Sequence, residues 1–276
     1  MKKPSRPVHR RPPLAGFTLI ELMVAVTIGL VVVLGFAVTF VNMKVTFNTQ
    51  DKMAQLQDNE RLAMSILTSS LQEAGYYDNC ADPTTTPITP PSCKKSDRIL
   101  GLLAFASSPG GGTTTGSQII MGTVAAGSAP ETLTTIYTST PGDGVMSCQG
   151  TTVASTVTTH PVEFRNTFYV DSTTQTLGCK VGAYDVSTGS AVTLSSYPLA
   201  YAPLVSNVTG MSVKYAVDTT SSGGPTQYQT ASAVTAANWL NVKGAQVTLT
   251  FVNPNASLGG ASSIQWVQNI NLMNNK

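Results

Sequence analysis

The stretch GFTLIELMVAVTIGLVVVLGFAVTFVNM, residues 16–43, decides the fold, because it combines a long apolar run with a single carboxylate. Glu21 is the only charged residue in this stretch, and the next charge is Lys44. The 22 uncharged residues between them would form a helix about 33 Å long, enough to cross the ~30 Å hydrocarbon core of a bilayer. An ionisable group in such surroundings costs free energy, so Glu21 is a candidate functional residue.

The charges that precede the apolar run predict its orientation in a membrane. The first 16 positions contain no acidic residue and five of the 16 basic ones, namely Lys2, Lys3, Arg6, Arg10 and Arg11. A basic flank stays in the cytoplasm, so we expect the chain after the helix to lie outside it. Without those five, 11 basic residues face 14 acidic ones. The remaining net charge of −3 offers no basic stripe that would support nucleic-acid binding.

Three kinds of N-terminal processing occur in exported chains, and the sequence argues against two of them. A secretory signal peptide has a shorter apolar run that ends in an A-x-A-like site, whereas this run continues past Thr39. A lipoprotein needs a cysteine at the cleavage point, and the first cysteine is Cys80. An uncleaved anchor remains, as does cleavage between Gly16 and Phe17, before the apolar run begins.

The segment GFTLIELMVAV, residues 16–26, resembles the N-terminal methylation signal of type IV pilins and type II secretion pseudopilins. In that family a prepilin peptidase cuts after the glycine, on the cytoplasmic side, and methylates the new N-terminal phenylalanine. The resemblance implies that residues 1–16 are a leader peptide ending at Gly16 and that Phe17 is the first mature residue. It also implies that Glu21 of an incoming subunit pairs with the Phe17 amine of a neighbour. Such pairing removes much of the cost of burying either charge.

The helical pattern continues beyond the membrane and assembly helix expected over residues 17–43. Residues 44–75 contain no proline, and their apolar residues recur at intervals of three, four and seven. The recurring residues are Leu56, Ala63, Leu67, Leu71 and Ala74. This spacing is typical of an amphipathic helix, and Gly75 is a plausible terminator. The sequence therefore predicts one helix over residues 17–75, whose second half lies against a folded domain.

The cysteines predict disulfides rather than a metal site. The chain has four, Cys80, Cys93, Cys148 and Cys179, and an even number in an exported chain implies two bonds. Three pairings are possible, and we favour Cys80–Cys93 with Cys148–Cys179 because it closes the shortest loops. Zinc is the competing interpretation, but no CxxC is present and the two histidines, His9 and His160, are isolated.

After residue 100 the pattern changes to alternating apolar and polar residues, which is typical of antiparallel strands with one buried face. The residues expected on that face are Val162, Phe164, Phe168, Val170, Met211, Val213, Tyr215, Val217, Val247, Leu249, Phe251, Ile264, Trp266, Ile270 and Leu272. The apolar stripe of the helix can cover this face. The sequence therefore predicts an α+β fold, in which a long N-terminal helix packs on an antiparallel β-sheet head over residues 76–276.

Motifs for catalysis, cofactor binding or metal binding are missing. His160 has no accompanying GxSxG motif, and Asp143 lacks the spaced carboxylates of a calcium loop. The three glycines at 110–112 are not followed by the Gly-Lys-Ser/Thr of a phosphate loop. We therefore predict that the protein is not an enzyme and holds neither a metal nor a cofactor.

Three further stretches narrow the resemblance. Residues 61–80, RLAMSILTSSLQEAGYYDNC, end a long helix in Ala-Gly-Tyr before a cysteine, which is similar to minor pilins of the PilW type. Residues 205–219 and 239–253 are similar to the same family. The resemblance implies a pilin-like fold and a non-enzymatic subunit that joins other minor pilins in a complex at the tip of a type IV pilus. That complex primes polymerisation of the major pilin and so supports twitching motility, adhesion or DNA uptake.

The resemblance also implies partners and a location. The partners are other minor pilins, the major pilin, the prepilin peptidase, the pilus assembly platform of the inner membrane and, before assembly, its lipid. The chain would cross the inner membrane once, with its N-terminus cytoplasmic and its head periplasmic, and then move to the pilus at the cell surface. Two alternatives remain, a type II secretion pseudopilin of the GspJ kind and a membrane-anchored adhesin that never polymerises.

Overall fold

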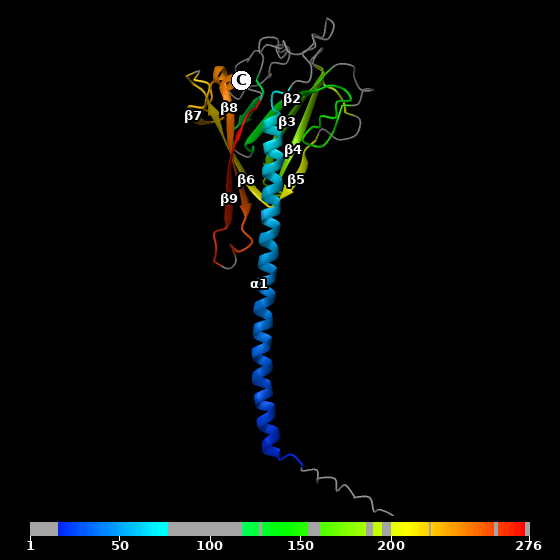
Figure 1. Cartoon of the computed structure of the whole chain (residues 1–276), viewed down its shortest axis with the longest axis vertical. Helices are drawn as coiled ribbons and strands as arrows, with labels where there is room; N and C mark the ends of the chain where they lie inside the picture. Colours follow the sequence, from blue (N-terminus) through cyan, green and yellow to red (C-terminus); the bar gives the residue numbers. More distant parts are fainter. Residues whose placement is uncertain are drawn as a thin grey trace, which may run out of the picture. The chain divides into compact units, whose positions relative to one another are not determined.

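The structure, a computed structural model, describes residues 16–76, 118–126, 129–153, 161–185, 190–194, 200–220, 222–256 and 259–273. The chain forms two compact units, Met1–Lys52 and Met53–Lys276. Helix α1, Leu19–Glu73, supplies the helical part of the first unit and continues into the second (Figure 1). The predicted helix over residues 17–75 is therefore confirmed, with each end two residues shorter.

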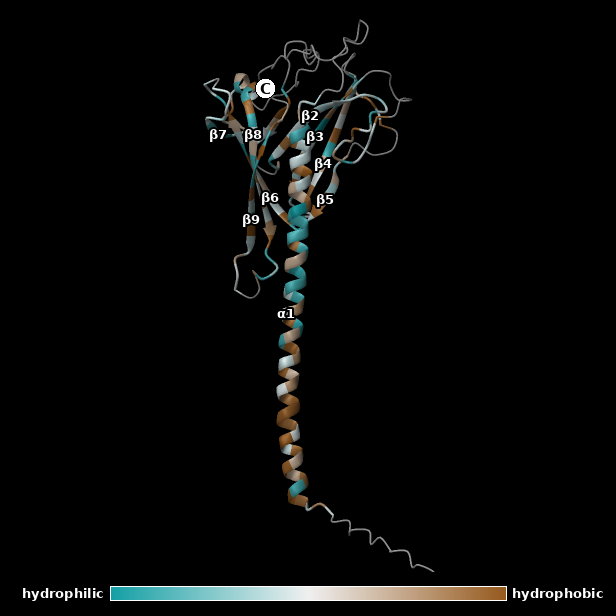
Figure 2. Cartoon of the chain, viewed as in Figure 1, coloured by the Kyte–Doolittle hydropathy of each residue, from teal (hydrophilic) through white to brown (hydrophobic). Residues whose placement is uncertain are grey.

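The described part of the first unit is mainly helical and largely apolar, and several threonine hydroxyls bond to carbonyls of the same helix (Figure 2). The Thr27 hydroxyl donates to the carbonyl of Val24 at 2.9 Å, and the Thr39 hydroxyl donates to that of Gly35 at 2.9 Å. A bond of this kind satisfies a hydroxyl without a partner from outside the helix. The helix can therefore enter an apolar environment without stranding these groups.

In the second unit, α1 buries the stripe of apolar residues that its spacing predicts. All five residues of that stripe are buried, and Met64 and Ser70 join them. The helix ends at Glu73, and Gly75 follows in the left-handed conformation, with φ of 78°. Its N–H donates to the carbonyl of Ile136 at 2.7 Å, so the turn that stops the helix also ties it to a strand.

The head contains two antiparallel sheets where the sequence predicts one (Figure 1). The first has the order β1-β2-β3-β4-β5 and consists of β1 (Ile120–Thr123), β2 (Thr132–Ser139), β3 (Val162–Asp171), β4 (Thr176–Asp185) and β5 (Ala202–Ser206). The second has the order β7-β6-β8-β9 and consists of β6 (Val208–Val217), β7 (Gln227–Thr230), β8 (Val242–Val252) and β9 (Ser263–Asn271). A 3₁₀ helix, η3 (Ala236–Asn241), precedes β8.

A single residue separates the two sheets along the chain. Asn207 lies between β5 and β6 with φ of 63°, a conformation that asparagine adopts more readily than most residues. The N–H of Val208 donates to the carbonyl of Gln175, in the turn between β3 and β4 of the first sheet. The carbonyl of Asn207 accepts from the N–H of Val252, in β8 of the second sheet. The chain therefore changes sheets at Asn207 without a linker.

Polar contacts join the C-terminal part of α1 to both sheets. The hydroxyls of Ser70 and Thr135, on β2, lie 2.6 Å apart. The Gln268 amide, on β9, donates to the Thr68 hydroxyl at 3.3 Å. Because the buried faces of both sheets also join the core that contains the helix stripe, this part of α1 is an integral element of the head.

The predicted buried faces of β3, β6 and β8 are confirmed, whereas that of β9 is only half right. Ile270 and Leu272 are buried, but Ile264 is half-buried and Trp266 is 37% exposed. Trp266 has Leu249 of β8 beside it, and β9 is the last strand of its sheet. Alternation predicts which face a side chain occupies, but an edge position leaves one flank of that face uncovered.

On β3, the face opposite the predicted buried face also carries a buried side chain, which simple alternation does not predict. Glu163 on β3 is 1% exposed, and the Nε of Arg165 lies 2.5 Å from its carboxylate. Burial raises the pKa of Glu163, and the Arg165 charge opposes that rise. Arg165 in turn lies over the ring of Tyr184, 4.3 Å from its centroid. The guanidinium thus compensates a carboxylate that water does not reach.

The two sheets meet at a glycine, which gives a prediction about stability. A Cβ on Gly122, in β1, would lie 1.8 Å from the Tyr215 hydroxyl and 2.7 Å from the backbone oxygen of Thr132. We expect Gly122→Ala to lower the free energy of unfolding by about 1–3 kcal/mol, measured by denaturant titration. The matched control is Gly210→Ala, whose Cβ would lie 3.6 Å from Thr250, an ordinary contact. Equal stability of the two variants would contradict this packing.

Candidate assembly site: the start of helix α1

The three sequence-predicted assembly residues lie at the N-terminal end of α1. Gly16 and Phe17 precede the helix, and Glu21 lies in its first turn. Phe17 is 84% exposed, and Gly16 and Glu21 are exposed as well. The peptide bond predicted for cleavage therefore lies in accessible, non-helical backbone, as a peptidase requires.

Thr18 gives the site a local structure that the sequence argument missed. The backbone N–H of Glu21 lies 3.4 Å from the Thr18 hydroxyl oxygen, and that hydroxyl lies 3.5 Å from the Glu21 carboxylate. Threonine before the helix with glutamate three residues later is the pattern of a capping box. A carboxylate in the first turn also interacts favourably with the helix dipole. The signal Thr-x-x-Glu at residues 18–21 was present in the sequence, and Glu21 therefore has a structural role as well as its predicted one.

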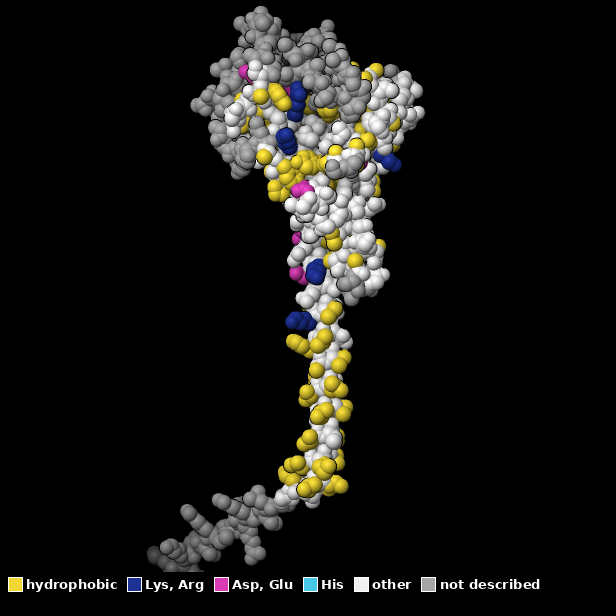
Figure 3. Space-filling view, turned by 180° about the vertical axis from the view of Figure 1, so that it is seen from behind, with side chains coloured by type: hydrophobic (Ala, Val, Ile, Leu, Met, Phe, Trp, Pro, Cys, Tyr) yellow, Lys and Arg dark blue, Asp and Glu magenta, His cyan; other side chains and the backbone are white. Residues whose placement is uncertain are grey.

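The surface that follows Glu21 is apolar on every side of the helix. Its large exposed side chains include Leu22, Met23, Val26, Leu30, Val33, Phe36, Phe40 and Phe47. Figure 3 shows hydrophobic side chains all along this part of α1, with charged ones sparse. By length and composition, α1 can cross a membrane. Contiguous apolar surface of this extent marks a contact with lipid or protein.

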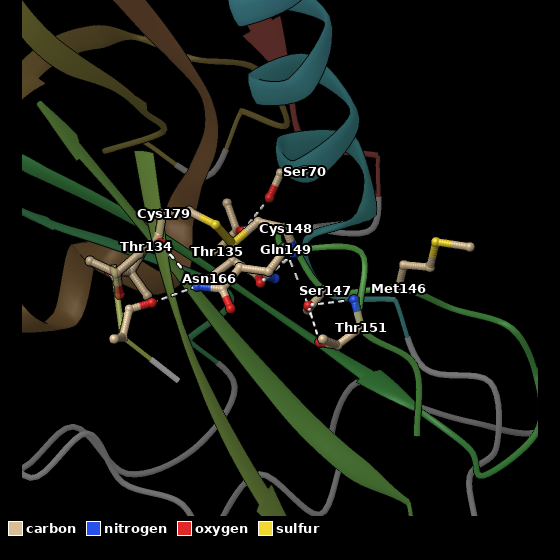
Figure 4. The surroundings of a disulfide bond; sticks show 12 residues. Ser70, Thr134, Thr135, Met146, Ser147, Cys148, Gln149, Thr151, Asn166 and Cys179 are labelled. Atoms are coloured by element: carbon tan, nitrogen blue, oxygen red, sulfur yellow. Dashed lines mark hydrogen bonds between the residues drawn. A yellow bond between two sulfur atoms is a disulfide. The ribbon is translucent and has the colours of Figure 1, made fainter. Parts of the chain in front are cut away.

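A disulfide joins Cys148 and Cys179, which is the pairing favoured for these two cysteines (Figure 4). Cys179 lies in β4, and Cys148 lies in the loop that follows β2. The N–H of Cys148 donates to the Asn166 side-chain oxygen at 2.9 Å, and the Gln149 amide donates to the carbonyl of Cys179 at 3.0 Å. The disulfide and the hydrogen bond to Asn166 together tie this loop to β4 and β3 of the first sheet. Cys80 and Cys93 lie outside the described residues.

Candidate catalytic and metal-binding residues do not gather in the described part of the chain. No three His, Cys, Asp or Glu residues there lie close enough to hold a metal ion. The Asp143 carboxylate accepts bonds from its own loop, from the Ser139 hydroxyl at 2.9 Å and the N–H groups of Thr140 and Val145 at 2.6 and 2.8 Å. It therefore shapes a turn. His160 lies outside the described residues.

The described part of the head includes a shallow hollow near the end of α1. Its volume is about 400 Å³, and it is lined by Glu73, Tyr76, Tyr137, Gly144, Val145 and Met146. The Tyr137 hydroxyl donates to the carbonyl of Met146, and burial raises the pKa of both Tyr137 and Glu73. A tyrosine with this hydrogen bond and a raised pKa is a poor acid or nucleophile. The hollow is therefore better explained as a gap in the packing between α1 and the loop after β2 than as an active site.

The fold is of the pilin-like α+β class, in which a long N-terminal apolar helix packs against antiparallel sheets. The predicted cleavage point lies in exposed, non-helical backbone before that helix. A family model described as type IV pilus-assembly protein W, PilW, matches residues 167–268, and the prokaryotic N-terminal methylation motif matches residues 15–37. The two matches support a type IV minor pilin of the PilW family. No curated protein and no solved structure matches the chain significantly.

The matched ranges include the predicted assembly residues and strands of both sheets. The methylation motif includes Gly16, Phe17 and Glu21, and the PilW match runs from the middle of β3 to β9, across both sheets. The matches support a type IV pilin-related role, a membrane anchor with a periplasmic head, and interaction with other pilus components.

Proposed function

We propose that the protein is a non-enzymatic minor pilin that joins other minor pilins in a complex at the pilus tip and primes polymerisation of the major pilin. The observation that carries this proposal is the methylation motif at the head of an exposed, membrane-length apolar helix. The motif supplies a route to a free amine at Phe17. The helix supplies surface that only lipid or other helices can cover.

The first step is processing at the cytoplasmic face of the inner membrane. The prepilin peptidase removes residues 1–16 by cutting after Gly16 and methylates the α-amino group of Phe17. A methylated amine still carries a proton at neutral pH, so the mature chain begins with a cation four residues before the Glu21 carboxylate. The accessible backbone around Gly16 supports this step.

The second step moves the helix from lipid into a bundle of pilin helices at the assembly platform. Glu21 of the incoming chain pairs with the Phe17 amine of a subunit already in the bundle, and each charge compensates the other. A charge left alone in that environment carries a large penalty, so only one axial position is favourable. Apolar packing supplies affinity, and the ion pair supplies register.

The head then contacts neighbouring minor pilins, and its own contribution is binding energy rather than catalysis. The PilW match across both sheets favours the pilus over the type II secretion pseudopilin. The same complex would support twitching motility, adhesion or DNA uptake according to what else the tip carries. The charge of the mature chain gives no support for direct contact with nucleic acid.

Mass spectrometry of the native N-terminus tests the proposal. We expect the chain isolated from membranes and from sheared pili to begin with methylated Phe17. As a control, cells that lack prepilin peptidase should yield a chain that keeps residues 1–16. A chain that retains its leader in normal cells would overturn the pilin mechanism and support an uncleaved, membrane-anchored adhesin instead.

A further inference from the structure

Strand β9 is the last strand of the second sheet, and among the described residues no strand pairs with its outer side. The N–H of Leu272 donates to the carbonyl of Lys243, and the N–H of Asn253 donates to that of Ser262, which fixes the phase of the ladder between β8 and β9. In an antiparallel ladder, bonded and non-bonded pairs alternate. Five residues of β9 therefore direct their N–H and C=O groups away from β8, namely Ser263, Gln265, Val267, Asn269 and Asn271. Of these, Gln265, Val267 and Asn269 lie in the middle of the strand.

Native sheets protect exposed edges with charges, prolines or very short strands, and β9 has none of these. It is nine residues long, SIQWVQNIN, without a charged residue or a proline. Among the described strands at sheet edges, β1 and β7 have four residues each, and β5 has five and contains Pro203. The long edge is therefore also the unprotected one.

Apolar side chains flank this edge on both faces of the sheet. Trp266 is 37% exposed on the face that Leu249 shares, and Val267 is 57% exposed on the opposite face. A strand added beside β9 would cover both while bonding to the free backbone groups. An isolated exposed valine needs no explanation, but one that adjoins an exposed tryptophan and an open ladder indicates a binding surface.

A second copy of the chain in twofold pairing does not fit this edge. Figure 1 shows β9 running in the same direction as the part of α1 that belongs to the head. Antiparallel pairing of β9 with another β9 would reverse the direction of α1 in the second copy. Chains inserted in one membrane with the same topology all have α1 in the same direction. Twofold pairing of β9 with a second β9 is therefore unfavourable, and we take an extended segment of another subunit as the occupant.

We infer that the free edge of β9 binds an extended, uncharged segment of a neighbouring pilus subunit, which adds as a further strand to the second sheet. This inference rests on the proposed function, because that function supplies the neighbouring subunit. The segment carries no charge where it faces β9, since the edge offers no opposite charge to a group that pairing removes from water. Its backbone supplies most of the bonds, and its side chains over Trp266 and Val267 supply specificity.

Site-specific photocrosslinking in cells tests the inference with the full-length chain. A photoreactive side chain is placed in turn at Gln265, Val267 and Asn269, and at Ser212 as a control. Ser212 is exposed on β6 in the same row as Val267, because Thr248 pairs with both, but it lies two strands from the edge. Mass spectrometry then identifies the crosslinked residue of the partner.

The expected result is a ladder of crosslinks. The three edge positions should react with one pilin-type subunit at sites that advance by two residues per step, and Ser212 should not react with it. Crosslinks without this progression, crosslinks to a second copy of this chain, or no crosslink in assembled pili would each overturn strand addition. The last outcome would leave the proposed function intact, since the chain would still have entered pili.

Two substitutions separate backbone pairing from side-chain contact. Val267→Pro removes an N–H that points away from β8, so the fold is retained while the edge is blocked. We expect it to reduce crosslinking from Gln265 at least tenfold. Val267→Thr keeps the N–H and should reduce it far less. Equal crosslinking in the proline variant, with the head shown to be folded by circular dichroism, would exclude a β-ladder.

Discussion

Replacing Glu21 with glutamine is expected to reduce incorporation of the chain into pili by about a hundredfold or more. The substitution leaves the Phe17 amine of the neighbouring subunit without a counter-charge inside the helix bundle. Breaking one partner of a buried pair costs about 3–5 kcal/mol, and each 1.4 kcal/mol is a factor of ten. Membrane insertion and removal of residues 1–16 should be unchanged, because the apolar run and Gly16 are unaltered.

Glutamine is the informative substitution because Glu21 also has a local role. Its N–H bonds to the Thr18 hydroxyl, in a capping box that accepts glutamine as well as glutamate. Glu21→Gln therefore removes the charge and retains the cap, whereas Thr18→Ala weakens the cap and retains the charge. The measurement is the amount of chain in sheared pili relative to membranes, by immunoblot.

Comparing the two variants shows whether pilus incorporation depends on the charge of Glu21 or on the helix cap. Loss in Glu21→Gln with near-normal assembly in Thr18→Ala supports pairing between subunits. Normal assembly in Glu21→Gln, with loss in Thr18→Ala, would contradict it and leave Glu21 as a helix-capping residue only. The exposed side chain of Glu21 in the single chain is consistent with a group whose main partner comes from another subunit.

The helix was predictable from sequence almost to the residue, because its signals are local. Unbroken hydropathy indicates the apolar half, and the spacing from Leu56 to Ala74 indicates the buried stripe, every member of which is buried. Gly75 stops the helix through its own backbone conformation. The capping box was equally local at Thr18 and was missed only because Glu21 was interpreted through its charge.

The division of the head into two sheets was less accessible to sequence reasoning. Alternation shows that a strand has a buried face but carries no information about which strand lies beside it. The separation depends on the left-handed backbone of Asn207 and on the fit of Tyr215 against Gly122, which are distant in sequence. The exposure of Trp266 likewise depends on β9 being the last strand of its sheet. Long-range pairing decides both features.

The disulfide between Cys148 and Cys179 gives the largest expected effect on stability. It closes a loop with a sequence separation of 31. In the chain-entropy account, a cross-link of that span restricts the unfolded chain by about 3–4 kcal/mol. We therefore expect the variant Cys148→Ala/Cys179→Ala to lose about that much free energy of unfolding, measured by denaturant titration of the full chain in detergent.

Alanine is preferred to serine because Cys179 is fully buried, where a hydroxyl would need a partner. Reduction of a Cys80→Ala/Cys93→Ala chain provides the matched control, since it breaks the Cys148–Cys179 bond alone and leaves the side-chain volume at these two positions unchanged. The alanine variant and the reduced protein should agree, and hydrogen exchange should rise in the loop around Cys148 while the end of α1 stays protected. We expect α1 to stay protected because hydrogen bonds at Ser70 and Gly75 hold it to the first sheet independently of the disulfide. An equal loss of protection along the last turns of α1 would show that the disulfide also holds the helix. An unchanged unfolding midpoint would show that the disulfide stabilises neither the loop nor the helix.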